Sequence, residues 1–247
     1  LRTMLGHYLL RGRPGDPLAI EIMTRADPDL PVLDFSADDR PQHKHFHEIN
    51  TDKSVYRDKV VAFLARDPRD VIVSNFFQFT KRGGRKMARK DEFTGGLSDF
   101  VRYPRGGIPN IVAFYNAWAR ARHVPRRYHS ITYEGLHRDT AGELKRLVAV
   151  LGLPNHGPAA LDAAIAFGSF EHMRRIEEAG ALANPRLQNP RRNDPEAYKV
   201  RKGKIGGYRD YLGAEDIACI DGYLARELDD FFSNYKRPGG FHTPAPD

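Results

Sequence analysis

Residues 60–79 read VVAFLARDPRDVIVSNFFQF, and this stretch decides the fold. Its first six residues form a short apolar run rich in β-forming side chains, which predicts a buried strand over Val60–Ala65. Asp67 can cap a helix, and Pro68 suits the first helical position, where no backbone N–H is needed. The stretch therefore predicts a strand followed by a helix, with Arg66 at the carboxyl end of the strand.

Arg66 and Ser74 are candidate ligand-binding residues. In an open parallel sheet, ligands bind at the carboxyl ends of the strands, and Ser74 lies about two turns into the predicted helix. A guanidinium and a hydroxyl group that meet at this edge can together hold a phosphate. The alternative is that Arg66 only pairs with Asp67 or Asp70, and that Ser74 is a tolerated helix serine.

Composition narrows the class of protein. The 247 residues are enough for one large α/β domain, and 40% hydrophobic with 29% charged residues is ordinary for a soluble chain. No apolar run reaches the ~18 residues of a membrane span, and the single cysteine, Cys219, excludes an internal disulfide framework and fits a reducing cytoplasm. A net charge of +7 favours anionic partners, such as a nucleic acid, an anionic lipid, an acidic glycan or a phosphate-bearing cosubstrate.

A second strand–helix unit indicates a parallel sheet. Tyr128–Tyr133 reads as the next buried strand, and Asp139 then caps a helix with regular apolar spacing. Further elements are expected as a helix over residues 1–10, a short strand over Pro31–Phe35, a helix over Asn110–Arg122, a helix over Leu161–Glu178 interrupted at Gly168-Ser169, and a last helix over Ala214–Tyr235.

Two charged segments stay open to interpretation. HKHFHE, His43 to Glu48, holds three histidines, which allow a metal site, a polar loop or a lone catalytic histidine. KRGGRKMARK, Lys81 to Lys90, holds six basic residues and is either a solvated helix end or the mouth of an anionic site.

Four stretches agree in order and spacing with a known family. LARDPRDVIVSNFFQF, ITYEGL with the helix that follows it, FGSFEHMRR and RKGKIGGYRDYL together resemble the sulfotransferase family that uses 3′-phosphoadenosine 5′-phosphosulfate (PAPS), in its bacterial, cytosolic-type form. The resemblance runs from about residue 43 to Tyr235. It implies an α/β fold of the P-loop nucleotide-hydrolase type, with three layers, a central parallel sheet and helices on both faces. It also implies a single domain over residues 1–237 with a disordered tail over 238–247.

The resemblance implies a nucleotide site built from distant segments. Arg66 and Ser74 would grip the 3′-phosphate, and the late basic loop would close over it with Arg201, Lys202 and the backbone N–H of Gly203. The adenine would lie against two aromatic side chains: Tyr133 would contact it, and Phe170 would stack on it, with Ser169 beside it.

The resemblance also implies a catalytic base upstream of the central strand. The best match to the family's K-T-H string is His43-Lys44-His45, which gives the role to His45. The threonine of that string is absent here and His47 lies close by, so the assignment stays open between His45 and His47.

The implied reaction is transfer of a sulfuryl group from PAPS to an acceptor hydroxyl or amine, with adenosine 3′,5′-bisphosphate as the product. We expect a small-molecule, glycan or lipid acceptor, no nucleic acid partner, no metal and a cytoplasmic location. Two alternatives are a P-loop kinase-like phosphotransferase and a non-catalytic basic module that binds nucleotide, RNA or glycan.

The start of the chain departs from the family pattern. LRTMLGHYLL reads as the inside of a helix, with Leu1, Met4, Leu5 and Tyr8 on one stripe. The family places a strand and a turn resembling P-K-S-G-T-T-W before this helix, and that turn holds the 5′-phosphosulfate. We therefore expect an N-terminal truncation, with the first strand and this turn missing.

Overall fold

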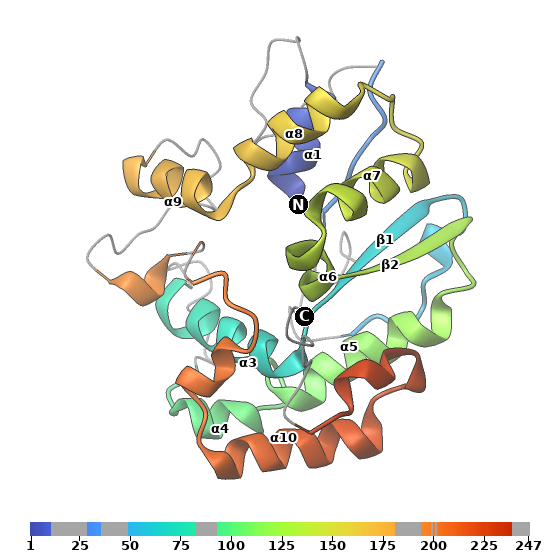
Figure 1. Ribbon diagram of the computed structural model, residues 1–247. Coiled ribbons are helices and arrows are strands. Elements are labelled where there is room, and N and C mark those ends of the chain that lie inside the picture. Colours follow the sequence, from blue (N-terminus) through green and yellow to red (C-terminus); the bar gives the residue numbers. More distant parts are fainter. Residues whose placement is uncertain are drawn as a thin grey trace, which may run out of the picture. The chain divides into compact units, whose positions relative to one another are not determined.

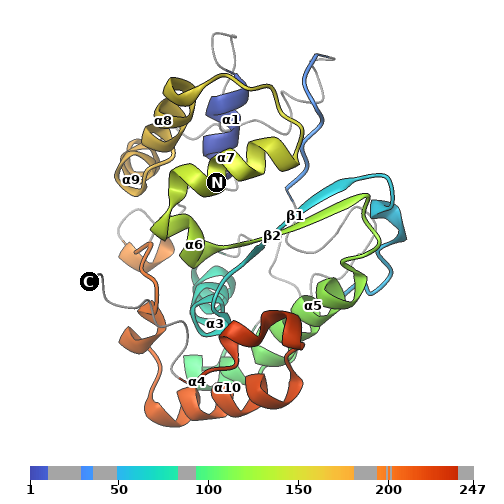
Figure 2. The same ribbon diagram turned by 45° about the vertical axis from the view of Figure 1, so that its right-hand side comes forward.

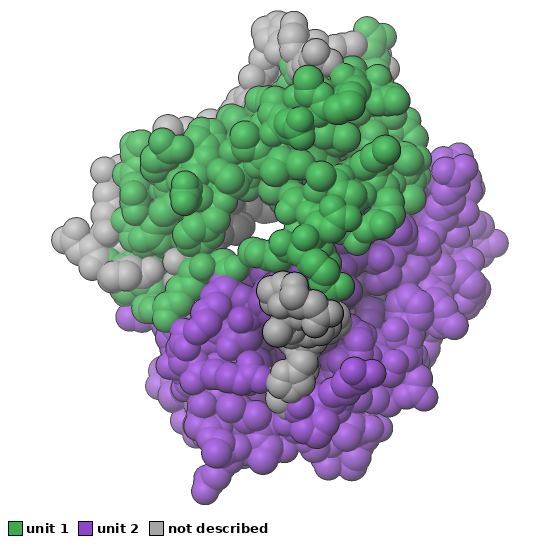
Figure 3. Space-filling view, viewed as in Figure 1, with its two compact units in different colours: residues 1–37, 135–203 green, residues 38–134, 204–247 purple. Residues whose placement is uncertain are grey.

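The computed structural model describes residues 1–10, 29–35, 49–82, 93–180, 194–198, 200 and 202–238. The chain divides into two compact units, coloured separately in Figure 3. Unit 1 consists of residues 1–37 and 135–203, and unit 2 consists of residues 38–134 and 204–247. Each unit is described by itself below.

Unit 2 contains a pair of parallel strands (Figure 1). Strand β1, Val60–Ala65, pairs with β2, Arg127–Thr132, in a register that runs from Val60 opposite Arg127 to Ala65 opposite Thr132. The predicted bounds of β1 are confirmed. The second strand begins and ends one residue earlier than predicted, because Tyr133 already opens the short helix α6, Tyr133–Arg138.

The helix after β1 forms as the sequence predicts. Helix α3 spans Pro68–Phe77, and the Asp67 side chain caps it by accepting a hydrogen bond from the backbone N–H of Arg69. Pro68 occupies the first helical position, where its missing N–H costs nothing. A π-helical turn over Gln78–Arg82 follows.

Aromatic side chains fill the core of unit 2. Phe63 on β1 packs against Tyr115 and Trp118 of helix α5, Ile108–Ala121, with ring centroids 5.6 and 6.0 Å away. The Phe232 ring also packs against Phe63, with the two ring centroids 5.6 Å apart. Such buried rings dominate core energetics because each removes a large apolar area from water. This core fixes the face of β1 from which Arg66 emerges at the strand end. Helices α4, Leu97–Val101, and α10, Ala214–Glu227, complete the packing.

The prediction of one continuous last helix over Ala214–Tyr235 is wrong at its C-terminal end. Helix α10 ends before Leu228, whose ψ of 135° is extended, and a separate 3-10 segment η7 spans Asp230–Tyr235. The side chain of Asn116 explains the break, because its amide donates to the Glu227 carbonyl and its oxygen accepts from the Asp229 N–H. These two bonds hold the chain open between the two segments.

Unit 1 is helical (Figures 1 and 2). Helix α1, Arg2–Leu9, packs against α8, Pro158–Phe167, which also contacts α7, Thr140–Val150. Asp139 caps α7, as predicted. The predicted break at Gly168-Ser169 is confirmed and leads into α9, Phe170–Ala179.

The remaining described segments are short. Residues 31–35 form no strand, contrary to the prediction, because no described segment pairs with them and a strand requires a partner. Short 3-10 turns occur at Ser54–Tyr56, Pro195–Ala197 and Gly207–Asp210. The histidine-rich segment 43–48, most of the basic run 81–90 and the tail from 239 onward lie outside the described residues.

Candidate functional site

The backbone at Arg66 is fixed directly after β1. The Arg66 N–H donates to the phenol oxygen of Tyr115 at 2.8 Å, and the Tyr115 hydroxyl donates to the Arg66 carbonyl at 2.6 Å. Burial raises the pKa of Tyr115 well above its usual value, so the phenol keeps the proton that it donates. Tyr115 thus holds both polar groups of the residue that carries the candidate cation.

The Arg66 side chain lies among three groups of unit 2. Its guanidinium carbon is 4.2 Å from the centroid of the Tyr133 ring, and Nη2 donates to the Lys204 carbonyl at 3.0 Å. The same nitrogen lies 3.3 Å from a carboxylate oxygen of Asp70. Nε is buried and has no hydrogen-bond partner among the described residues. The ion pair considered as the alternative is therefore present, but it leaves a buried donor of the guanidinium unused.

Asp70 joins the start of α3 to the late basic loop. It is 3% exposed, and its two oxygens accept from the backbone N–H groups of Gly206 and Tyr208, each at 2.9 Å. Because the same carboxylate pairs with Arg66, it orients the cation and anchors the loop that supplies the Lys204 carbonyl. The sequence offered Asp70 as a possible partner of Arg66, but it gave no sign of the bond to Gly206, which is 136 residues away.

The second arginine of the R-D-P-R-D string is structural. Arg69 is fully buried, and its guanidinium contacts the carboxylates of Asp67 and Asp221 and the backbone carbonyls of Tyr235 and Arg237. All of these partners belong to unit 2. The string therefore provides one interior arginine and one arginine at the strand end.

A buried carboxylate ties the ends of the two strands together. Glu134 accepts the Asp67 N–H at 2.9 Å with one oxygen and the Tyr235 hydroxyl at 2.9 Å with the other. Burial raises the pKa of Glu134, and these hydrogen bonds oppose the shift. Since Tyr133 is the preceding residue, this contact holds its ring beside Arg66.

Ser74 presents a hydroxyl on α3. It is exposed and lies four positions after Asp70, on the same face of the helix. Among the described residues its side chain forms no hydrogen bond, so the hydroxyl is accessible to a ligand.

Two predicted residues of unit 1 lie in contact. Phe170 opens α9 and is 42% exposed, which is high for a large apolar side chain. Gly203 has a φ of +62°, and a Cβ atom there would lie 2.7 Å from Cδ2 of the Phe170 ring. Ser169 caps α9 by accepting from the His172 N–H. The backbone of Gly203 thus lies directly against the Phe170 ring, and much of that ring stays exposed.

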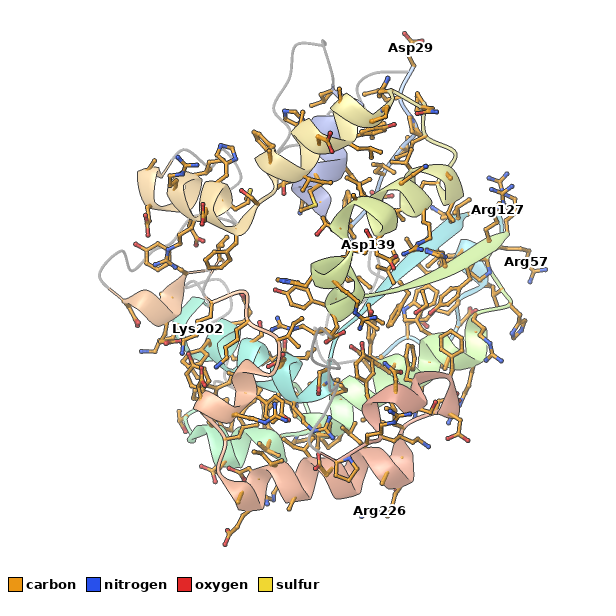
Figure 4. The ribbon with its side chains drawn as sticks, in the orientation of Figure 1. Asp29, Arg57, Arg127, Asp139, Lys202 and Arg226 are labelled. Carbon is orange, nitrogen blue, oxygen red and sulfur yellow. The ribbon has the colours of Figure 1, made fainter. Side chains whose placement is uncertain are left out.

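One of the other predicted residues is described and three are not. Lys202 is exposed and labelled in Figure 4. Arg201, His45 and His47 lie outside the described residues. The structure therefore brings together Arg66 with Tyr133 in unit 2, and Phe170 with Gly203 in unit 1.

Neither a metal site nor a membrane span is found among the described residues. They contain no group of three or more histidine, cysteine or acidic side chains arranged to hold a metal ion. No described helix has the length and apolar character needed to cross a bilayer.

A parallel strand pair, a helix capped directly after the first strand and a cation at that strand's carboxyl end define a P-loop-like α/β protein. Comparison with known proteins narrows the class. The sulfotransferase domain model matches residues 30–232, and the chain belongs to this family.

Curated relatives are distant and longer. Rat sulfotransferase 2A6 is 24% identical over 182 residues, which cover 72% of this chain and 60% of that protein. Human sulfotransferase 2B1 is 28% identical over 174 residues, covering 68% and 44%. Cytosolic sulfotransferase 12 of Arabidopsis thaliana is 25% identical over 195 residues, covering 76% and 58%. The chain thus spans 60% or less of the length of these three relatives.

Solved structures show the same fold. Mouse sulfotransferase SULT7A1 complexed with PAP matches with a TM-score of 0.54 at 18% identity, over 72% of this chain and 62% of that one. Retinol dehydratase in complex with androsterone and inactive cofactor PAP matches with a TM-score of 0.52 at 22% identity, over 72% and 50%. The α/β fold predicted from the sequence is confirmed.

Proposed function

We propose that this protein transfers a sulfuryl group from PAPS to an acceptor hydroxyl or amine. The observation that carries the proposal is Arg66, held at the carboxyl end of β1 against Tyr133 in a chain of the sulfotransferase family. The acceptor is a small molecule, a glycan or a lipid, and no metal takes part. A cytoplasmic location is supported by the single cysteine. Bacterial origin stays a prediction.

The residues in unit 2 fit a phosphate. The guanidinium of Arg66 is partly exposed and the hydroxyl of Ser74 is exposed, so a 3′-phosphate can accept hydrogen bonds from both. We propose that Arg201, Lys202 and the N–H of Gly203 bind the same phosphate. Asp70 pairs with the Arg66 guanidinium, so fewer of the donors of Arg66 are available to a phosphate. The positive charges of Arg201 and Lys202 would offset the negative charge of this carboxylate.

Aromatic surfaces fit the adenine. The exposed ring of Phe170 offers a flat face for stacking, and Gly203 leaves the space beside it open because it has no Cβ. We assign Tyr133 to a contact with the same base. PAPS supplies the sulfuryl group, and these residues fix its position.

Calorimetry with adenosine 3′,5′-bisphosphate and 5′-AMP tests the site. Arg66→Ala should weaken the bisphosphate by 10- to 150-fold, the scale of about 1.5–3 kcal/mol for a hydrogen bond to a charged group, and leave 5′-AMP unchanged. Phe170→Ala should weaken both ligands equally, since both carry adenine. Arg102→Ala, an exposed arginine on the end of α4, is the control for net charge.

Two results would contradict the proposal. Equal affinity of the unaltered protein for adenosine 3′,5′-bisphosphate and 5′-AMP would show that the protein has no site for the 3′-phosphate. Binding that falls steeply with salt and does not distinguish nucleotides would favour a non-catalytic basic module.

The catalytic base is tested separately. We propose that His45 takes the proton of the acceptor as it attacks sulfur, with His47 as the competing candidate. In a form of the protein that includes the strand and turn expected before Leu1, His45→Ala should lower the rate of labelled sulfate transfer by about two to four decades while affinity for the bisphosphate holds. Loss of transfer in His47→Ala but not in His45→Ala would move the role to His47.

A further inference from the structure

Unit 2 holds a cavity of about 620 Å³ that the sequence did not reveal. Its walls come from residues 49–57, from helix α5 and the turn after it, and from the end of α10. The volume lies within the ~300–1,000 Å³ typical of small-molecule sites.

The cavity is separate from the candidate nucleotide site. Its first wall precedes β1, whereas Arg66 follows the other end of that strand. A six-residue strand spans about 20 Å, so this first wall and Arg66 lie at opposite ends of it, and Arg66 does not line the cavity. Figure 4 shows Arg57 and Arg127 together at the amino end of the strand pair.

Helix α5 gives the cavity an apolar wall. Val112, Ala113 and Ala117 line it, and the small alanine side chains leave the space open. Val112 and Ala117 are buried, at 2% and 6% exposure, so the wall is continuous with the core of unit 2. An apolar body of one or two rings would gain free energy by lying against this face.

Basic side chains surround the apolar wall. Arg57, Arg120 and His123 line the cavity and are exposed, and neither arginine forms a salt bridge with a described residue. Two acids also line it: Asp52 accepts from both the N–H and the hydroxyl of Ser54, and Glu227 lies at the end of α10. The excess of cations favours a negatively charged ligand.

One of the residues that line the cavity is a buried lysine. Lys53 is 2% exposed, and its ammonium lies 4.9 Å from the Trp118 ring centroid and donates to the Asn50 carbonyl. Burial lowers the pKa of Lys53 to about 8. An anion beside the amine would offset the cost of burying its charge.

We propose that this cavity binds an amphipathic monoanion, with an apolar body of one or two rings against α5 and a single sulfonate, sulfate or carboxylate group near Lys53 and Arg120. The body gains affinity from the apolar wall, and the head group from the basic side chains around it. The site does not depend on the nucleotide chemistry proposed above.

The test compares an anionic probe with its neutral analogue. Naphthalene-2-sulfonate and 2-naphthoate should each bind at least tenfold more tightly than naphthalene-2-sulfonamide in calorimetry. Arg120→Gln should weaken the two anions about tenfold and leave the sulfonamide unchanged. Arg126→Gln is the matched control, because Arg126 is exposed on the connection that follows α5 but does not line the cavity.

A variant that fills the cavity gives an independent check. Ala113→Trp should abolish binding of both anions, whereas Ala149→Trp, on an exposed position of α7, should not. Thermal unfolding verifies that both variants fold. The proposal is overturned if the sulfonamide binds as tightly as the anions, or if Ala113→Trp binds them like the unaltered protein.

Discussion

Gly203 and Phe170 lie so close that any side chain on the glycine would enter the ring, since a Cβ atom would lie 2.7 Å from Cδ2. Gly203 also has a φ of +62°, a conformation that costs other residues about 1–2 kcal/mol. We therefore expect Gly203→Ala to displace the Phe170 ring and to weaken adenosine 3′,5′-bisphosphate tenfold or more in calorimetry.

Gly152 provides the matched control for this substitution. Its φ is +67°, but a Cβ atom there would have nothing within 4 Å. Gly152→Ala and Gly203→Ala should lower the free energy of unfolding by a similar ~1 kcal/mol of backbone strain. Only Gly203→Ala should change nucleotide affinity. A similar loss of affinity in both variants would show that the ring contact has no part in binding.

Asp70→Asn tests the link between α3 and the late loop. The carboxylate accepts two backbone N–H groups and pairs with Arg66, whereas an asparagine offers one oxygen and turns a donor toward the other N–H. We expect the free energy of unfolding to fall by about 2–3 kcal/mol, as for a hydrogen-bonded buried charge. Denaturant unfolding followed by circular dichroism measures it.

Asp99→Asn is the control for this second prediction. Asp99 is exposed in the first turn of α4 and accepts a single N–H, from Gly96. Its replacement should cost about 1 kcal/mol or less. If Asp70→Asn costs no more than Asp99→Asn, the loop is held by contacts other than this carboxylate.

The local part of the fold was predictable because its causes are local. Asp67, Pro68 and the apolar run before them determine the strand end and the helix start through neighbouring residues alone. The break before α9 was predictable for the same reason, since Gly168 and Ser169 are consecutive. The family resemblance assigned Arg66 and Tyr133 to two parts of one nucleotide, and in the structure these two side chains lie in contact.

Contacts between distant segments could not be predicted. The Asn116 side chain ends α10 from more than 100 residues away, so the periodicity that extended the last helix to Tyr235 gave no warning. The bond between Asp70 and the Gly206 N–H likewise depends on tertiary folding. The cavity beside Lys53 arises from the packing of three segments, and no local pattern signals it.

Arg69→Met and Arg66→Met should separate stability from binding. Arg69 is buried against Asp67 and Asp221, so its removal leaves carboxylates without their cation and should cost about 3–5 kcal/mol of unfolding free energy. Arg66 is partly exposed, and its partner Asp70 keeps two backbone N–H donors, so removal of Arg66 should cost less stability than removal of Arg69 but lower affinity for the bisphosphate. Paired denaturation and calorimetry measure both. Equal losses of stability would show that Arg66 is also structural.

Lys53→Met tests the cost of the buried amine through its pH dependence. Burial lowers the pKa of Lys53 to about 8 in the folded protein, from an ordinary value of 10.5. Below pH 8 the lysine is protonated in both the folded and unfolded chain, and the full cost of burying its charge opposes folding. Between these two values the unfolded chain binds more protons, so the stability contributed by this position rises with pH.

We therefore expect Lys53→Met to be stabilising relative to the unaltered protein at pH 7 and less so at pH 9.5, because the lysine is by then largely neutral when folded. Denaturant unfolding at each pH measures the difference in unfolding free energy between the variant and the unaltered protein. The titration of other groups cancels because both proteins contain those groups. Lys145→Met, on an exposed position of α7, is the control for the loss of a lysine. If Lys53→Met changes the free energy of unfolding by the same amount at pH 7 and at pH 9.5, the amine of Lys53 is solvated. The cavity beside it would then lack a buried cation.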